Sequence, residues 1–137
     1  MERNAELLNK AADRIEAVPE SYRQSTAASF SDESPCGTVS CMAGEIIICS
    51  EPTEELGLKK LWRIVRGSST NGVCDEARQL AGLLRAEIPA PIFGRDACAW
   101  PEPFRSQWYE YSNENKAKAA AGFLRYLAQG GAVEATD

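Results

Sequence analysis

Residues 35–49 read Pro-Cys-Gly-Thr-Val-Ser-Cys-Met-Ala-Gly-Glu-Ile-Ile-Ile-Cys and hold three of the five cysteines of the 137-residue chain. The segment passes from a turn into the most apolar run of the sequence. This run predicts a helix over residues 38–50, because a strand would need a second strand-like run to pair with, and the sequence offers none. A helix that is apolar on nearly all sides is a buried one, so we expect it at the centre of the fold.

Amphipathic helices are predicted on both sides of this central segment. Asn4, Thr53 and Ser112 or Asn113 have side chains that can cap the first turn of a helix. The predicted helices share apolar residues at three- and four-residue spacing, and they cover residues 4–18, 54–65, 73–86, 104–111 and 113–128. The sequence therefore predicts an all-α fold, a compact orthogonal bundle of five or six short helices around a buried central helix. We expect a single helical domain over residues 1–131 and a frayed tail over residues 132–137.

The charge of the chain is unevenly distributed. The formal net charge is −5, but residues 57–95 carry 7 basic and 3 acidic side chains, a net charge of +4. An acidic surface repels polyanions, which argues against general nucleic-acid binding. No apolar run approaches the roughly 18 residues of a membrane span, and the N-terminus lacks the apolar segment of a signal peptide. A cytoplasmic protein without a membrane partner is therefore expected.

The absence of histidine excludes several chemistries. Ser-His-Asp or Cys-His catalysis, histidine metal ligands and histidine pH switches are all closed to this chain. An odd number of cysteines without a secretion signal favours reduced thiols that pack as small apolar residues. The cysteines form no C-x2-C pair, so no metal or cofactor is expected, although Cys36 and Cys41 with two distant thiols remain geometrically possible zinc ligands.

Cys36-Gly37-Thr38-x-x-Cys41-x-Ala43-Gly44 resembles a C-G-T-x-x-C-x-A-G motif of small helical proteins from bacteria and phages. The similarity extends over residues 4–128 and includes the later segment Trp100-Pro101-Glu102-Pro103-Phe104. These proteins usually have tryptophan after Ala-Gly, where this chain has Glu45. The resemblance implies an intracellular helical domain and supplies no activity.

Cys41 is the sharpest chemical candidate. If Thr38 caps the central helix, Cys41 occupies the third helical position, where backbone amides and the helix dipole favour a thiolate. A nucleophile or a redox sensor with Cys36 as its partner would follow. The alternative is a small buried residue, which the lack of a histidine base favours.

Two groups of side chains are candidates for binding a partner. Lys59, Arg63 and Arg66 belong to a basic amphipathic segment that could meet phosphates or an acidic partner, or form a solvated helix face. Trp108, Tyr109 and Tyr111 belong to an aromatic cluster, together with Trp100 and Phe104. Aromatic side chains of this kind anchor protein interfaces, and they also fill the core beneath long loops.

Glu45 interrupts the apolar central helix. It lies either on a solvent-exposed face or in the interior with an arginine partner, because a buried unpaired carboxylate is costly. Arg125 and Arg78 are the candidate partners. A general acid/base pair of Glu45 with a second carboxylate stays open, since no spacing identifies the second group.

Together these observations predict a non-enzymatic protein-binding module in a bacterial or phage cytoplasm. A phage-encoded inhibitor of a host protein is one concrete form, since small acidic proteins can block basic sites by charge complementarity. Two alternatives stay open. One is a thiol-based enzyme or redox sensor that uses Cys41 and Cys36, and the other is a structural protein that self-associates through Trp108 and Tyr111.

Overall fold

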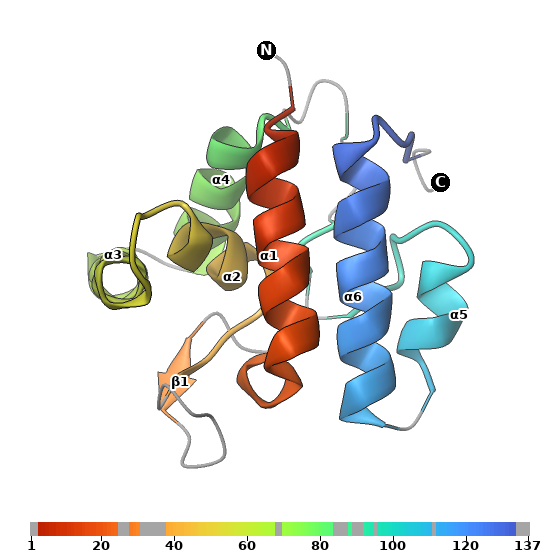
Figure 1. The fold of residues 1–137 in the computed structure, drawn as a ribbon, viewed down its shortest axis with the longest axis horizontal. Helices are drawn as coiled ribbons and strands as arrows, with labels where there is room; N and C mark the ends of the chain where they lie inside the picture. Colours follow the sequence, from red (N-terminus) through yellow and green to blue (C-terminus); the bar gives the residue numbers. More distant parts are fainter. Residues whose placement is uncertain are drawn as a thin grey trace.

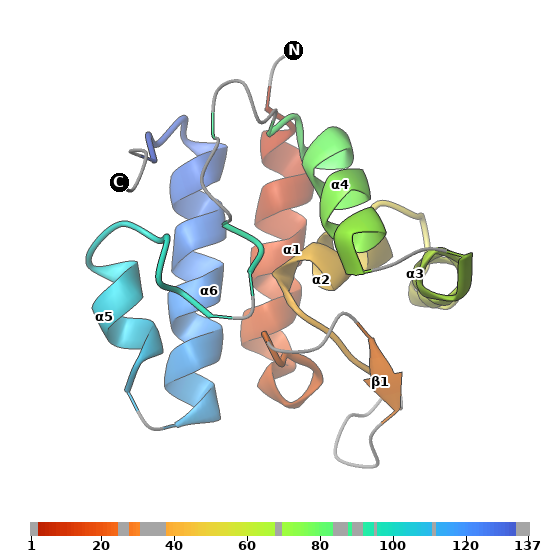
Figure 2. The same ribbon diagram turned by 180° about the vertical axis from the view of Figure 1, so that it is seen from behind.

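The computed structural model describes residues 3–24, 28–30, 38–67, 70–83, 88, 92–94, 96–110 and 112–133. Helices α1 (Ala5–Ala17) and α6 (Asn113–Ala128) lie side by side and antiparallel, and they pack extensively on each other (Figures 1 and 2). The side chains of Asn4 and Ser112 cap them by accepting hydrogen bonds from backbone amides of their first turns. The predicted caps of these two helices are therefore confirmed.

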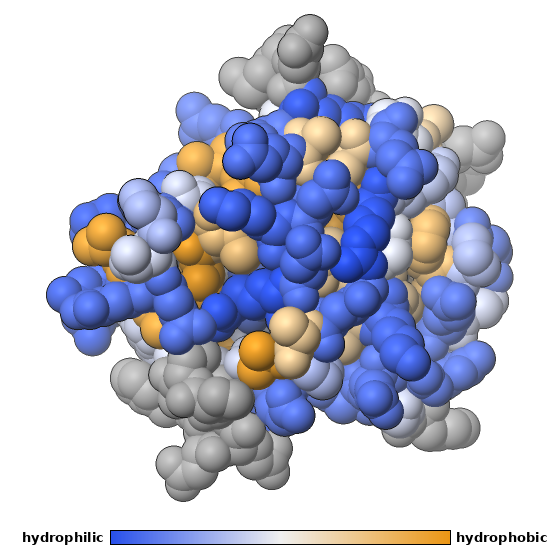
Figure 3. Space-filling view, viewed as in Figure 1, coloured by the Kyte–Doolittle hydropathy of each residue, from blue (hydrophilic) through white to orange (hydrophobic). Residues whose placement is uncertain are grey.

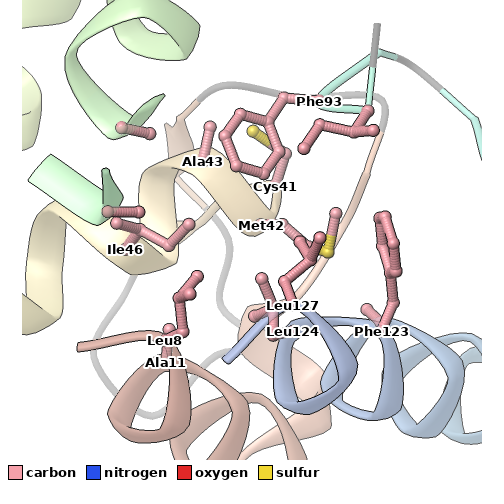
Figure 4. Packing of buried hydrophobic residues seen from close by; sticks show 14 of the residues in the cluster. Leu8, Ala11, Cys41, Met42, Ala43, Ile46, Phe93, Phe123, Leu124 and Leu127 are labelled. Carbon is pink, nitrogen blue, oxygen red and sulfur yellow. The ribbon is translucent and has the colours of Figure 1, made fainter. Parts of the chain in front are cut away.

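Helix α2 (Met42–Cys49) is the buried centre that the sequence predicts. Residues 42–48 are all buried, and the helix packs on α1, α3 (Glu54–Gly67) and α4. Met42 points from α2 toward Leu124 and Leu127 of α6 (Figure 4). Helix α4 (Thr70–Ala81) and the short helix α5 (Phe104–Trp108) complete the bundle. The all-α fold is thus confirmed.

The central helix begins later than expected. Thr38–Val39 forms strand β2, which pairs antiparallel with strand β1 (Ser29–Phe30). Ser40 then forms a bridge with Tyr22, which follows the 3₁₀ turn Pro19–Ser21. These pairings hold residues 38–40 extended, as β-branched threonine and valine favour. The predicted start at residue 38 is therefore wrong, and Cys41 is the N-cap of α2 instead of its third residue.

Helix α4 both begins and ends earlier than its apolar spacing predicts. It begins at Thr70, three residues before the predicted start, and ends at Ala81, five residues before the predicted end at residue 86. At this end Gly82 has a φ of 70°, a left-handed conformation that favours glycine. The amide of Leu83 then bonds to Arg78 O at 2.8 Å, which closes the last turn.

At the C-terminus, Val133 belongs to the buried cluster, and residues 134–137 lie outside the described part of the chain. Among the described residues, none of the helices has both the length and the hydropathy needed to cross a membrane.

Candidate functional site: a basic groove on helix α3

Helix α3 (Glu54–Gly67) lies at one edge of the molecule, across the direction of α1 (Figures 1 and 2). It packs on α2 and α4 through buried Leu61 and Gly57. A Cβ atom on Gly57 would lie 2.1 Å from the carbonyl oxygen of Ile48, so only glycine permits this approach to the end of α2. The close contact fixes one side of α3 and leaves the opposite side to form a surface.

An open groove of about 770 Å³ runs along that outer side of α3. Half-buried Leu58 and Trp62 supply its apolar lining, and Thr38 of β2 borders it. The indole Nε1 of Trp62 donates a hydrogen bond to Thr38 Oγ1 at 3.3 Å, which ties α3 to β2. In the space-filling view, apolar surface lies among hydrophilic residues over the α3 region, whereas the α1 face is largely hydrophilic (Figure 3).

Three cations lie beside this apolar lining. Lys59, Arg63 and Arg66 are exposed and line the groove, at positions that a helix places on one face. Within the described residues, no carboxylate forms an ion pair with Arg63 or Arg66. Lys59 Nζ lies 3.2 Å from Glu55 Oε1, and both side chains are more than 70 % exposed. Such an exposed pair is worth only about 0.5 kcal/mol, so Lys59 can exchange this partner at little cost.

The structure therefore brings together the three basic residues that the sequence singles out. It adds Leu58 and Trp62, two apolar residues of the same helix that line the groove. The sequence does contain a signal for their role, because Leu58 and Trp62 directly precede Lys59 and Arg63. An apolar stripe bordered by charge on one helix face is typical of a surface groove. Only Leu61 and Gly57 of α3 are fully buried.

The aromatic candidates that the structure describes, Trp108 and Tyr109, do not line this groove. Trp108 is half-buried, and its Nε1 donates a hydrogen bond to Tyr22 Oη at 3.0 Å. Lys116 Nζ lies 3.7 Å from the centre of the Trp108 ring, and Trp100 packs edge-on at 6.2 Å. The indole of Trp108 is thus engaged by groups of the same chain. Tyr109 is 48 % exposed, and Tyr111 lies outside the described residues.

The contacts of Trp108 continue into a buried polar chain. Tyr22 Oη donates to Gln24 Oε1 at 2.9 Å, and Gln24 Nε2 donates to Gly94 O at 2.7 Å. Burial raises the pKa of Tyr22 well above its usual value, so the phenol stays protonated and keeps donating. This series of hydrogen bonds connects Trp108 of α5 to Tyr22 and Gln24, which lie between α1 and α2. Trp108 therefore has a structural role. Trp100 is buried, whereas Phe104 is only half-buried.

Cys41 lies in an environment that disfavours a thiolate. Its side chain is buried at the start of α2, and burial raises the pKa of the thiol to about 11. The thiol is therefore protonated at neutral pH, contrary to the expectation from a position inside the first helical turn. Cys36, its proposed partner, lies outside the described residues.

We expect Cys41 in the folded protein to react with iodoacetamide at pH 7.5 at least about a hundredfold more slowly than Cys98, because the reagent reaches a buried thiol only when the fold opens locally. Cys98 is the internal control, since it is an exposed free cysteine. Pulse labelling followed by peptide mass spectrometry measures both rates in one sample. Equal rates at the two positions would instead favour a thiol-based enzyme or redox sensor that uses Cys41.

Glu45 is buried, and it forms an ion pair with Arg14. The prediction that Arg125 or Arg78 is its partner is therefore wrong. Arg14 Nε lies 2.6 Å from Glu45 Oε2, and Ser40 Oγ donates to Glu45 Oε1 at 2.9 Å. Arg14 Nη1 also lies 2.5 Å from Glu54 Oε2 at the start of α3. The arginine thus joins α1, α2 and α3, and with Gly57 it positions the helix that carries the groove. The polar atoms of Glu45 are all satisfied within the fold, which indicates a structural carboxylate.

The remaining acids and thiols do not gather into a metal centre in the described part of the chain, where no three His, Cys, Asp or Glu side chains cluster.

Comparison with protein-family models, with curated proteins and with solved structures gave no match to this chain.

Proposed function

We propose that the protein is a non-enzymatic binding module that engages another protein through the groove on α3. The observation that carries this proposal is the juxtaposition of three exposed cations, Lys59, Arg63 and Arg66, with half-buried Leu58 and Trp62 in one groove. Apolar side chains supply affinity when they are covered, and a charged rim selects the partner and speeds encounter. An acidic segment of the partner protein complements this rim.

A protein partner suits the charge of the whole chain better than a nucleic acid does. The net charge of −5 repels a long polyanion, whereas a short acidic segment meets only the local cations of α3. One concrete form of the proposal is a phage-encoded inhibitor that acts in the cytoplasm by occupying a host protein. In that form the basic groove captures an acidic element of the host protein and blocks its normal contacts.

The double variant Arg63→Glu/Arg66→Glu is expected to lose the partner, because it places two carboxylates beside an acidic ligand. The matched control is Arg105→Glu/Lys118→Glu, which changes the net charge equally at exposed positions on α5 and α6. The tagged proteins are incubated with bacterial lysate at about 50 and 150 mM salt, and the captured proteins are quantified by mass spectrometry.

A protein that is captured by the wild type and the control, but at least about tenfold less by the α3 variant, supports the proposal. Equal capture by all three proteins would place the contact elsewhere. The absence of any specific partner at both salt concentrations would count against a binding module. Circular dichroism checks that each variant is folded.

A further inference from the structure

The three cations that line the groove are arranged along a line. Lys59 and Arg66 are seven residues apart, which corresponds to about 10 Å along the helix axis, and Arg63 lies between them. Leu58 and Trp62, four residues apart, lie beside them in the same groove. The site is therefore an elongated apolar seam with positive charge along it, which differs from a compact pocket for a small anion.

A partner helix has the same periodicity as this seam. Its apolar side chains at positions i and i+4 can pack against Leu58 and Trp62, and carboxylates on the neighbouring face recur at the spacing of the α3 cations. The border formed by Thr38 and the indole of Trp62 is held by a hydrogen bond, so the lining is already in place before binding. Glu55, at the N-terminal end of the groove, disfavours further negative charge there.

Resting on the proposed function, we infer that the groove binds an acidic amphipathic helix of the partner protein, which lies along α3 with apolar side chains on Leu58 and Trp62. Binding by such a helix requires both its charge and its apolar periodicity. A disordered acidic segment or a single-stranded nucleic acid would need only the charge.

The test uses the full chain and four fluorescein-labelled probes. The first is an 18-residue peptide with leucines at i, i+4, i+7 and i+11 and glutamates on the flanking faces. The second contains the same residues in scrambled order, the third has lysine for glutamate, and the fourth is an 18-nucleotide single-stranded DNA. Fluorescence anisotropy gives each dissociation constant, and circular dichroism reports helix formation by the unlabelled peptides.

We expect the first peptide to bind about tenfold or more tightly than the other three probes and to gain helix on binding. The variant Arg63→Glu/Arg66→Glu should lose this binding, while Arg105→Glu/Lys118→Glu retains it. Equal binding of the scrambled peptide, or no binding of the first peptide, would contradict the inference that the groove binds a helix. The lysate experiment would still decide separately whether α3 binds a protein. Tighter binding of the DNA would contradict both proposals.

Discussion

Replacing Arg14 by alanine is expected to lower the free energy of unfolding by about 3 kcal/mol at pH 7.5, because a buried carboxylate then loses its cation. Glu45 is only 1 % exposed, and Arg14 is 13 % exposed. The substitution also removes the link to Glu54, so the start of α3 loses a tether. Urea titration followed by circular dichroism measures the loss.

Arg125→Ala is the matched control for this substitution. Arg125 also bridges two carboxylates, those of Asp13 and Glu16 on α1, but these groups are exposed. Exposed ion pairs contribute little, so a loss of less than about 1 kcal/mol is expected. Similar losses for Arg14→Ala and Arg125→Ala would contradict the structural role assigned to the buried pair.

The effect of Arg14→Ala should also depend on pH. Burial raises the pKa of Glu45 from 4.5 to about 6, and the attraction of Arg14 only partly offsets this rise. Because the folded state holds the proton more tightly, the stability contributed by Glu45 is complete below about pH 4.5 and is lost as the pH rises through 6. Without Arg14 the pKa rises further. The difference in unfolding free energy between wild type and variant should therefore widen from pH 5 to pH 8.

Gly57→Ala is expected to cost about 3 kcal/mol, because the new methyl group would meet backbone atoms that cannot rotate away. The added Cβ would lie 2.1 Å from Ile48 O and 2.7 Å from Ile48 Cα. Helix α3 must then move away from α2, so binding at the groove should weaken as well. Thermal unfolding and peptide anisotropy measure the two effects.

Gly67→Ala supplies the control on the same helix. Among the described residues, no atom outside the adjoining backbone of α3 lies within 4 Å of a Cβ built at Gly67, so alanine should be neutral or stabilise the helix by up to about 1 kcal/mol. Equal stability of the two alanine variants would mean that α3 does not depend on the close approach at Gly57.

Local signals in the sequence predict much of this fold. Asn4 and Ser112 cap helices because their side chains satisfy nearby amides, and Pro19 follows the end of α1 because it cannot continue a helix. The burial of residues 42–48 follows from the lack of a polar face. Such features depend on residues within one or two turns of each other, so a single sequence contains the information.

Features that depend on distant residues were not predicted. Residues 38–40 are extended because they pair with Ser29–Phe30 and Tyr22, and neither partner reads as a strand by itself. The partner of Glu45 lies 31 residues away. One signal was present, because Arg14 lies seven residues after Leu7 and three after Ala11 and thus on the buried stripe of α1.

The candidate site was predicted only in part, because it depends both on local spacing and on contacts between distant residues. Lys59, Arg63 and Arg66 share a helix face, which their spacing alone indicates. Whether that face is open or covered depends on where α3 packs, and the contact of Gly57 with α2 decides this. Conversely, Trp108 was a candidate for binding a partner, but Tyr22 and Lys116, which are far from each other in the chain, engage its ring.

An NMR titration of the ¹⁵N-labelled protein with the acidic amphipathic peptide tests the role of the α3 groove most directly. The chain has three tryptophans, at positions 62, 100 and 108, so each indole N–H serves as a separate reporter. We predict that the Trp62 signal shifts as peptide is added, while the signals of buried Trp100 and of Trp108 stay in place. A shift of the Trp108 signal with an unchanged Trp62 signal would assign binding to the aromatic cluster and contradict the account.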